Sequence, residues 1–173
     1  MGLYSQYLRE LRPLMMKNNV RLVHLGLANQ LPESVRKELA ESISLTSKNS
    51  GLIVSLALNY GSRTEIVEAV KKIAKEYKTG KLSLEDINEE CISNHLDTAT
   101  LPDPDLLIRT SNELRISNFL LWQISYTEFY VTETLWPDFD SAQMDKAIIA
   151  YAHRSRRFGG INADNLASSS PIA

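Results

Sequence analysis

The sequence is poor in cysteine and histidine and has no excess of charge of either sign. Cys91 is the only cysteine, so no disulfide can form within the chain, and the three histidines show no metal-ligand spacing. Lysine and arginine number 19 against 21 aspartates and glutamates, a net charge of -2 at pH 7. Binding along the phosphates of a nucleic acid needs a basic surface, so we expect no nucleic-acid partner. No apolar run approaches the roughly 18–20 residues that cross a bilayer.

Several common catalytic motifs are also missing. The sequence has no Walker-type P-loop and no G-x-G-x-x-G dinucleotide motif. It also has no G-x-S-x-G element, the nucleophile elbow of many hydrolases. A local basic site for one small anion remains compatible with the net charge.

The composition is that of a packed protein, with 43% hydrophobic and 23% charged residues among 173. We expect one domain over residues 1–160. Serine, alanine and asparagine dominate residues 161–173, which predicts a disordered tail.

Strand-like and helix-like segments alternate along the chain. Apolar runs predict strands at 20–25, 52–58, 106–108 and 129–131, the second of them buried on both faces. Helical spacing predicts a helix at the N-terminus with a break or kink at Pro13, and further helices after Pro32, over 66–74 and over 142–152. Ser83, with Asp86 three residues later, resembles another capped helix start. The alternation predicts an α/β fold with a mainly parallel sheet flanked by helices.

Two polar clusters follow predicted strands, where open parallel sheets bind ligands. One is NYGSR at residues 59–63; the other, at 109–117, contains Arg109, Arg115 and Ser117. The fork of donors on arginine matches phosphate oxygens, so this second cluster could hold a diphosphate, helped by free amides if a helix begins near Ser117. The alternative is that the arginines are surface ion-pair residues, with Glu113 as an obvious partner.

Glu128 lies between aromatic and apolar residues. A carboxylate at the edge of a buried strand needs a partner. Magnesium is one candidate, because it binds one or two carboxylates together with substrate phosphates. The alternative is a structural glutamate held by hydrogen bonds. Trp122 and Trp136 also lie in apolar contexts, and we expect both in the core.

Several segments together resemble the signature of the cis-prenyltransferases, the undecaprenyl and dehydrodolichyl diphosphate synthases. They are DLLIRTSNELRISNFLLWQ at 105–123, YTEFY at 126–130, LWPDF at 135–139, RRFGG at 156–160 and, upstream, LNYGSR at 58–63. The resemblance covers roughly residues 20–160. It implies an α/β fold like that of undecaprenyl diphosphate synthase.

The resemblance also implies roles for individual residues. Arg109, Arg115 and Ser117 would bind the diphosphate of isopentenyl diphosphate, and Glu128 would help to hold Mg2+, in some arrangements from the partner subunit of a homodimer. Further substrate-binding residues would be Asn59, Arg63, Arg157 and Gly159, the last two through an Arg-x-Gly element that reaches across the dimer.

Some family features are not in this sequence. The Asp-Gly-Asn-x-Arg-Trp loop, which carries the catalytic aspartate and binds the allylic diphosphate, is absent, so no catalytic residue is assigned. We therefore expect an N-terminally truncated family member with little or no activity alone. Ser111 and Asn112 stand where many members carry a glycine pair, which would restrict the backbone.

The implied reaction is condensation of isopentenyl diphosphate with an allylic prenyl diphosphate to a cis-polyprenyl diphosphate. The alternative is a non-catalytic partner subunit of a heteromeric cis-prenyltransferase, although such subunits do not keep Arg109, Arg115, Ser117 and Glu128 together. The expected location is cytoplasmic or plastid, with peripheral membrane association through the long apolar product.

Overall fold

The computed structural model describes residues 2–154, which form two compact units. Unit 1 comprises Met1–Pro102 and Ile116–Trp122, of which Met1 is not described. Unit 2 comprises Asp103–Arg115 and the described part of Gln123–Ala173. The predicted tail at 161–173 lies outside the described residues, as do Arg157 and Gly159.

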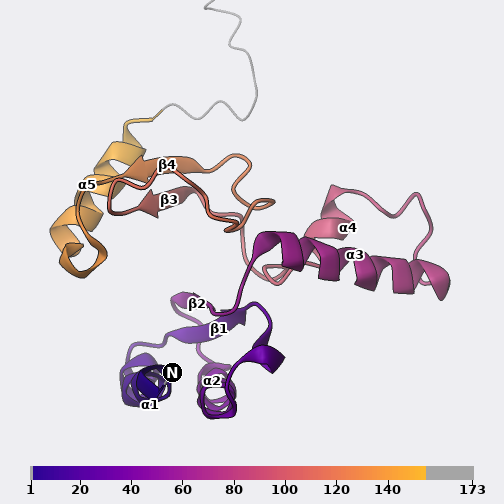
Figure 1. The fold of residues 1–173 in the computed structure, drawn as a ribbon, viewed down its shortest axis with the longest axis horizontal. Helices are drawn as coiled ribbons and strands as arrows, with labels where there is room; N and C mark the ends of the chain where they lie inside the picture. The colour runs from indigo at the N-terminus through magenta and orange to yellow at the C-terminus, as the bar shows by residue number, and fades with distance from the viewer. Residues whose placement is uncertain (1, 155–173) are drawn as a thin grey trace, which may run out of the picture. The chain divides into compact units, whose positions relative to one another are not determined.

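Unit 1 begins with a helix–strand–helix–strand arrangement (Figure 1). Its elements are α1 (Gly2–Lys17), β1 (Arg21–Leu25), the short 3-10 helix η1 (Ala28–Gln30), α2 (Glu33–Thr46) and β2 (Ile53–Ala57). Strands β1 and β2 pair in parallel, with Leu22 opposite Val54. The predicted parallel pairing is therefore confirmed for these strands.

The core of this part joins α1, β1 and α2. It contains one buried apolar cluster, made of Leu8, Leu22, Leu31, Val35 and Leu39. Burial of such side chains contributes roughly 1.5–3 kcal/mol each, which makes this cluster the main source of stability for the β1–β2 platform. A polar contact adds to it, since the Arg12 guanidinium of α1 lies 2.6 Å from the Glu38 carboxylate of α2.

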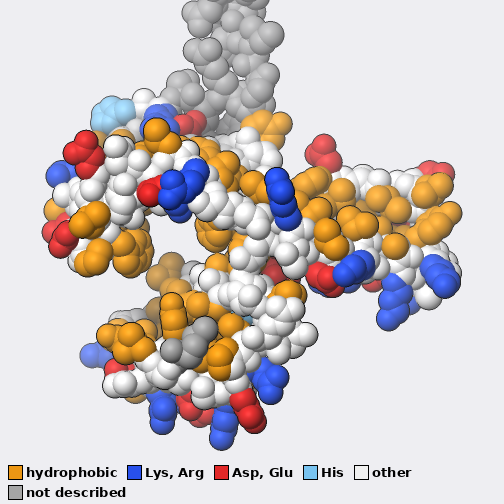
Figure 2. All heavy atoms as spheres, in the orientation of Figure 1, with side chains coloured by type: hydrophobic (Ala, Val, Ile, Leu, Met, Phe, Trp, Pro, Cys, Tyr) orange, Lys and Arg blue, Asp and Glu red, His pale blue; other side chains and the backbone are white. Residues whose placement is uncertain are grey.

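Helix α3 (Ser62–Lys78) continues unit 1 and is followed by the short α4 (Glu89–Ser93). The sequence predicted the helix, but its buried side is the stripe of Glu65, Ala69 and Ile73, whereas Val67 and Val70 are about half exposed. Figure 2 shows hydrophobic side chains at the surface over α3 and α4. The described part of the chain therefore leaves some apolar side chains of α3 exposed.

Unit 2 contains β3 (Leu106–Arg109), β4 (Glu128–Val131), a 3-10 turn η2 (Trp136–Asp138) and α5 (Ser141–Ala152). The two strands are parallel, with Leu107 opposite Phe129 and Arg109 opposite Val131. Helix α5 begins after Asp140, whose carboxylate accepts a hydrogen bond from the backbone N–H of Gln143 and so caps the helix. The α/β class is confirmed, with a parallel strand pair in each unit.

One local prediction of secondary structure is wrong and another is wrong in part. Helix α1 continues through Pro13, so the predicted break is absent and a kink there stays a prediction. No helix begins at Ser83, although Asp86 accepts a hydrogen bond from the Ser83 backbone N–H; α4 begins later, capped by the Asn88 side chain. A side-chain bond to one backbone N–H is enough for a turn but does not propagate a helix.

Two burial predictions are also wrong within the described residues. Strand β2 is not buried on both faces, since Val54 is 38% exposed and Ser55 and Ala57 are exposed too. Trp136 is 74% exposed and stacks on Phe139 instead of entering the core. Across residues 2–154, no helix has the length and apolar composition to cross a membrane.

Candidate functional site

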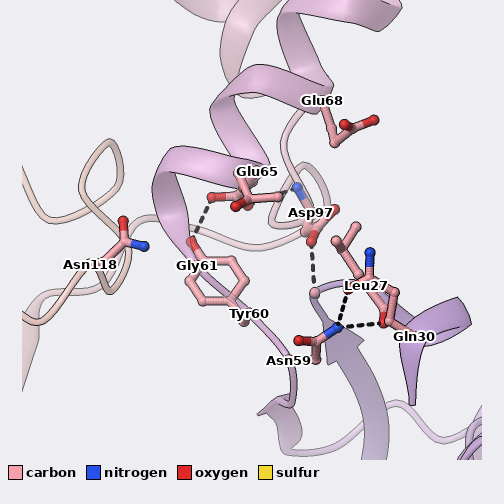
Figure 3. A pocket seen from close by; sticks show the side chains of 11 residues that line it. Leu27, Gln30, Asn59, Tyr60, Gly61, Glu65, Glu68, Asp97 and Asn118 are labelled. Atoms are coloured by element: carbon pink, nitrogen blue, oxygen red, sulfur yellow. Dashed lines mark hydrogen bonds between the residues drawn. The ribbon is translucent and has the colours of Figure 1, made fainter. Parts of the chain in front are cut away.

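A pocket of about 270 Å³ lies where β1 and β2 of unit 1 end and α3 begins (Figure 3). This is the carboxyl edge of a parallel strand pair, the edge at which such sheets bind ligands. Its lining includes Gly26 after β1, Asn59 and Tyr60 after β2, and Glu65 in the first turns of α3. The sequence predicted the polar cluster at 59–63 at such an edge, and the structure places it there.

A hydrogen-bonded chain through Glu65 connects the walls of this pocket. The Tyr60 hydroxyl donates to Glu65 Oε2 (2.6 Å), and the backbone N–H of Asp97 donates to Glu65 Oε1 (2.9 Å). The Asp97 carboxylate in turn accepts from the backbone N–H of Gly26 (2.8 Å). Burial, together with the Glu65 carboxylate beside it, raises the pKa of the Tyr60 hydroxyl well above its usual value. Glu65 and Asp97 could not be predicted from the sequence, because nothing local distinguishes them from surface carboxylates.

The Asn59 side chain forms hydrogen bonds with residues around the pocket. It has a positive φ of 51°, and its side-chain amide donates to Leu27 O (3.1 Å) and Gln30 Oε1 (3.3 Å). The amide therefore fixes the turn after β1. The Arg63 side chain is exposed, while its backbone N–H donates to Asn118 Oδ1 (3.0 Å). The contacts of Asn59 and of the Arg63 backbone are structural, and the substrate-binding role predicted for both stays a prediction.

Arg109 and Arg115 line one pocket of about 240 Å³ in unit 2. The remaining lining residues are Leu107, Glu113, Leu114, Phe129 and Val131. Side chains alternate between the two faces of a strand, so Leu107 and Arg109 share one face of β3. The structure thus brings the two predicted phosphate ligands to a single pocket with an apolar wall.

The loop between these arginines is compatible with both interpretations of Arg115, the ion-pair residue and the phosphate ligand. Arg115 Nη1 lies 2.6 Å from Glu113 Oε2, so the ion pair of the alternative interpretation is present. The Arg115 side chain is nevertheless 71% exposed, and a bond of this kind in water contributes only about 0–1 kcal/mol. An arriving diphosphate can compete for this guanidinium. Ser111 and Asn112 have positive φ values of 60° and 52°, the left-handed conformation that glycine adopts most readily.

Ser117 belongs to unit 1, whereas Arg109 and Arg115 belong to unit 2. It is exposed and has a positive φ of 53°. No helix begins near Ser117, which lies in a run of turns, so the expected free amides of a helix N-terminus are not available there. This part of the prediction is wrong, because consecutive left-handed residues cannot start a right-handed helix.

Glu128 faces away from the arginine pocket. It precedes Phe129 on β4, and neighbouring residues of a strand point to opposite faces. Its carboxylate lies 2.7 Å from Arg154 Nη1, so it has a protein partner. Among residues 2–154, no group of three or more histidine, cysteine, aspartate or glutamate side chains could hold a metal ion. Magnesium needs only one or two carboxylates where substrate phosphates supply further ligands, so the role of Glu128 in holding Mg2+ stays a prediction.

The histidines behave largely as structural residues. His24 Nε2 lies 3.0 Å from Leu58 O, so this strand histidine has a backbone partner. The sulfur of the buried Cys91 lies 3.9 Å from Nδ1 of His95, four residues further along the chain. The His95 Nδ1 is closer to Cys91 O, at 2.7 Å.

A family model and individual relatives point to the same family. Residues 1–159 match the family model described as "Putative undecaprenyl diphosphate synthase". The chain is 48% identical over 163 residues to the isoprenyl transferase of Geobacillus kaustophilus, covering 94% of this chain and 63% of that protein. It is 49% identical over 157 residues to the isoprenyl transferase of Halalkalibacterium halodurans, covering 91% and 61%. The chain therefore spans less than two thirds of the length of these relatives.

Two solved structures resemble this chain in fold. One is lavandulyl diphosphate synthase from Lavandula x intermedia in complex with dimethylallyl diphosphate, with a TM-score of 0.88, 38% identity, and coverage of 92% of this chain and 69% of that chain. The other is a probable undecaprenyl diphosphate synthase from Campylobacter jejuni, with a TM-score of 0.80, 37% identity, and coverage of 91% and 72%.

Proposed function

Because this chain belongs to the undecaprenyl diphosphate synthase family, the cis-prenyltransferases, we propose that it condenses isopentenyl diphosphate with an allylic prenyl diphosphate. The product is a cis-polyprenyl diphosphate. The observation that carries the proposal is the unit 2 pocket, in which two arginines meet an apolar wall.

The chemistry of this pocket suits one of the two substrates. Isopentenyl diphosphate has a diphosphate at one end and a five-carbon hydrocarbon at the other. Arg109 and Arg115 supply planar forks of donors for phosphate oxygens, and Leu107, Phe129 and Val131 supply apolar contacts. Ser117 is a further substrate-binding residue in the proposal, as the signature sequence implies.

These residues would act by holding and orienting the substrate. The double bond of isopentenyl diphosphate attacks the allylic carbon, a carbon–carbon bond forms, the allylic diphosphate leaves, and a proton is lost to create the cis double bond. The diphosphate bound by the arginines does not leave, so its role is to fix the position of the double bond relative to the allylic carbon. Such orientation is a large source of rate acceleration.

Other parts of the proposal rest on the resemblance. They are magnesium supplied with the substrate phosphates, homodimer formation, contacts of Asn59, Arg63, Arg157 and Gly159 with substrate, and membrane association through the product. A cytoplasmic location is part of the same proposal. The named isoprenyl transferases are bacterial, which gives no support to a plastid location.

Transfer of labelled isopentenyl diphosphate tests the function. The chain is assayed with magnesium and farnesyl diphosphate, alone and joined behind a segment carrying the Asp-Gly-Asn-x-Arg-Trp loop of the family. We expect little or no long product from the chain alone and product from the joined protein. Product from neither, with normal folding, would favour the partner-subunit alternative, and a homologue captured by the chain would then be sought.

A further inference from the structure

The segment after Ile116 has an unusual backbone. Ser117, Asn118 and Leu120 have positive φ values of 53°, 59° and 49°. Asparagine tolerates this left-handed conformation, but serine and leucine adopt it only where the surroundings impose it. Such strain is found preferentially at functional sites, where neighbouring structure holds it in place.

The first turn of α3 holds this segment. The backbone N–H of Ser62 donates to Asn118 O (2.9 Å), and the backbone N–H of Arg63 donates to Asn118 Oδ1 (3.0 Å). In the opposite direction, the backbone N–H of Leu121 donates to the hydroxyl of Ser62 (2.9 Å). Ser62 is fully buried, so water does not compete for its hydroxyl. We call these three hydrogen bonds the α3 clamp.

Two further contacts fix the same register. The rings of Tyr60 and Phe119 meet edge to face with centroids 5.8 Å apart. At Gly61, a Cβ atom would lie 2.8 Å from Asn118 Nδ2, so only glycine lets the asparagine approach this closely. Figure 3 shows Asn118 beside Gly61 at the start of α3.

The α3 clamp also decides what the start of α3 can bind. The first backbone N–H groups of a helix are normally free to bind an anion. Here the N–H groups of Ser62 and Arg63 are occupied by Asn118, and that of Glu65 donates to Gly61 O. The N–H groups of Ser62 and Arg63 are therefore not available to a phosphate near this segment, whereas the exposed Ser117 hydroxyl lies beside Asn118 in the chain.

We infer that Asn118 is a positioning residue for isopentenyl diphosphate binding, which holds Ser117 in its left-handed conformation by bonding to the first turn of α3. The inference rests on the proposed function, in which Ser117 is a substrate-binding residue. Asn118 acts through Ser117 and does not itself touch the substrate.

Asn118→Gly tests this, because glycine allows the positive φ and removes the side-chain amide. Asn19→Gly is the matched control: Asn19 has a φ of 54°, and its Oδ1 accepts from the backbone N–H of Ser50 at 3.0 Å, within the same unit. The dissociation constant for isopentenyl diphosphate is measured by calorimetry on the full chain. We expect about tenfold weaker binding for Asn118→Gly, as small misplacements of binding groups cost that much or more. Asn19→Gly should stay within about twofold.

A double-mutant cycle with Ser117→Ala separates positioning from general structure. If Asn118 acts through Ser117, Asn118→Gly weakens binding in the wild-type background but hardly at all in the Ser117→Ala background. Equal weakening in both backgrounds would overturn the inference, and so would unchanged affinity of Asn118→Gly. Should Asn118→Gly not fold, Ser62→Ala removes the opposite half of the α3 clamp and is tested in the same cycle with the same expectation. Failure of the wild-type chain to bind would instead refute the proposed function, and this inference with it.

Discussion

At the scale of single residues, Arg115 is the side chain whose two interpretations can be separated most easily. It pairs with Glu113 at 2.6 Å and lines the unit 2 pocket. A charged hydrogen bond contributes about 1.5–3 kcal/mol, so Arg115→Ala should weaken isopentenyl diphosphate binding roughly 10- to 100-fold. Arg36→Ala, on the exposed surface of α2, is the control and should have no effect. Isothermal titration calorimetry measures both.

Glu113→Gln provides the complementary result. Removing the carboxylate frees Arg115 from its ion pair, so we expect equal or tighter binding of isopentenyl diphosphate. If Arg115 were only a surface ion-pair residue, neither Arg115→Ala nor Glu113→Gln would change the dissociation constant. An unchanged dissociation constant in both variants would therefore support the ion-pair interpretation.

The raised pKa of the Tyr60 hydroxyl predicts that stability depends on pH. Its folded-state pKa is raised, first by burial and then by Glu65, so at alkaline pH the unfolded chain loses this proton first. The raised pKa of Tyr60 therefore contributes fully to the free energy of unfolding below about pH 10, the usual tyrosine pKa. This contribution is lost as the pH rises further. Urea unfolding should show a fall in the free energy of unfolding above that pH, and this fall should be shallower in Tyr60→Phe.

The same substitution should also be costly at pH 8. Tyr60→Phe removes the 2.6 Å hydrogen bond to the buried Glu65, and bonds to charged groups contribute about 1.5–3 kcal/mol. Tyr4→Phe is the control, since Tyr4 is 50% exposed on α1, and it should change stability by less than about 0.5 kcal/mol. Equal stability of the two variants at pH 8 would contradict the proposed importance of the Glu65 network.

At the scale of elements, the turn after β1 depends on Gly26. Its φ is +113°, and a Cβ there would lie 2.6 Å from Leu58 O. Gly80 also has a positive φ, +72°, but a Cβ there meets nothing within 4 Å. Gly26→Ala should therefore destabilise the chain by about 2 kcal/mol more than Gly80→Ala, measured by urea unfolding. Similar losses for the two would mean that the approach of β2 to this turn is not tight.

The sequence predicted elements well where a long apolar pattern defines them. The strands at 106–108 and 129–131 and the helix at 142–152 all appear within one residue of their predicted bounds or slightly longer. It failed where a local signal competed with tertiary contacts. Ser83 and Asp86 form one hydrogen bond without a helix, and no helix begins near Ser117, where the α3 clamp holds a run of turns.

The site residues that could be predicted are likewise those with a local signal in the sequence. Arg109 and Arg115 were identified from residue type and spacing, and they do share a pocket. Glu65, Asp97 and Asn118 were missed, because their partners are Tyr60, Gly26 and the start of α3, from 5 to 71 residues away in the sequence. Asn118 alone carried a usable signal, as it directly follows the predicted ligand Ser117.

At the scale of the whole molecule, the described residues expose many large apolar side chains. Leu3, Leu52 and Leu84, on three different segments of unit 1, are 61%, 67% and 63% exposed. Exposed apolar area of this extent favours association. We expect sedimentation velocity to show concentration-dependent self-association and the chain to bind the dye ANS. A monodisperse monomer at all concentrations, without dye binding, would contradict this and would also weigh against the proposed homodimer.

Binding of isopentenyl diphosphate tests the central claim most directly, because it needs neither an allylic substrate nor turnover. The chain and a variant carrying both Arg109→Ala and Arg115→Ala are titrated with isopentenyl diphosphate in a calorimeter, after urea unfolding has established that both are folded. We predict saturable binding by the chain and loss of at least about 100-fold in affinity in the variant. Equal affinity of the two proteins, or no binding by the chain, would contradict the assignment of these arginines to a diphosphate.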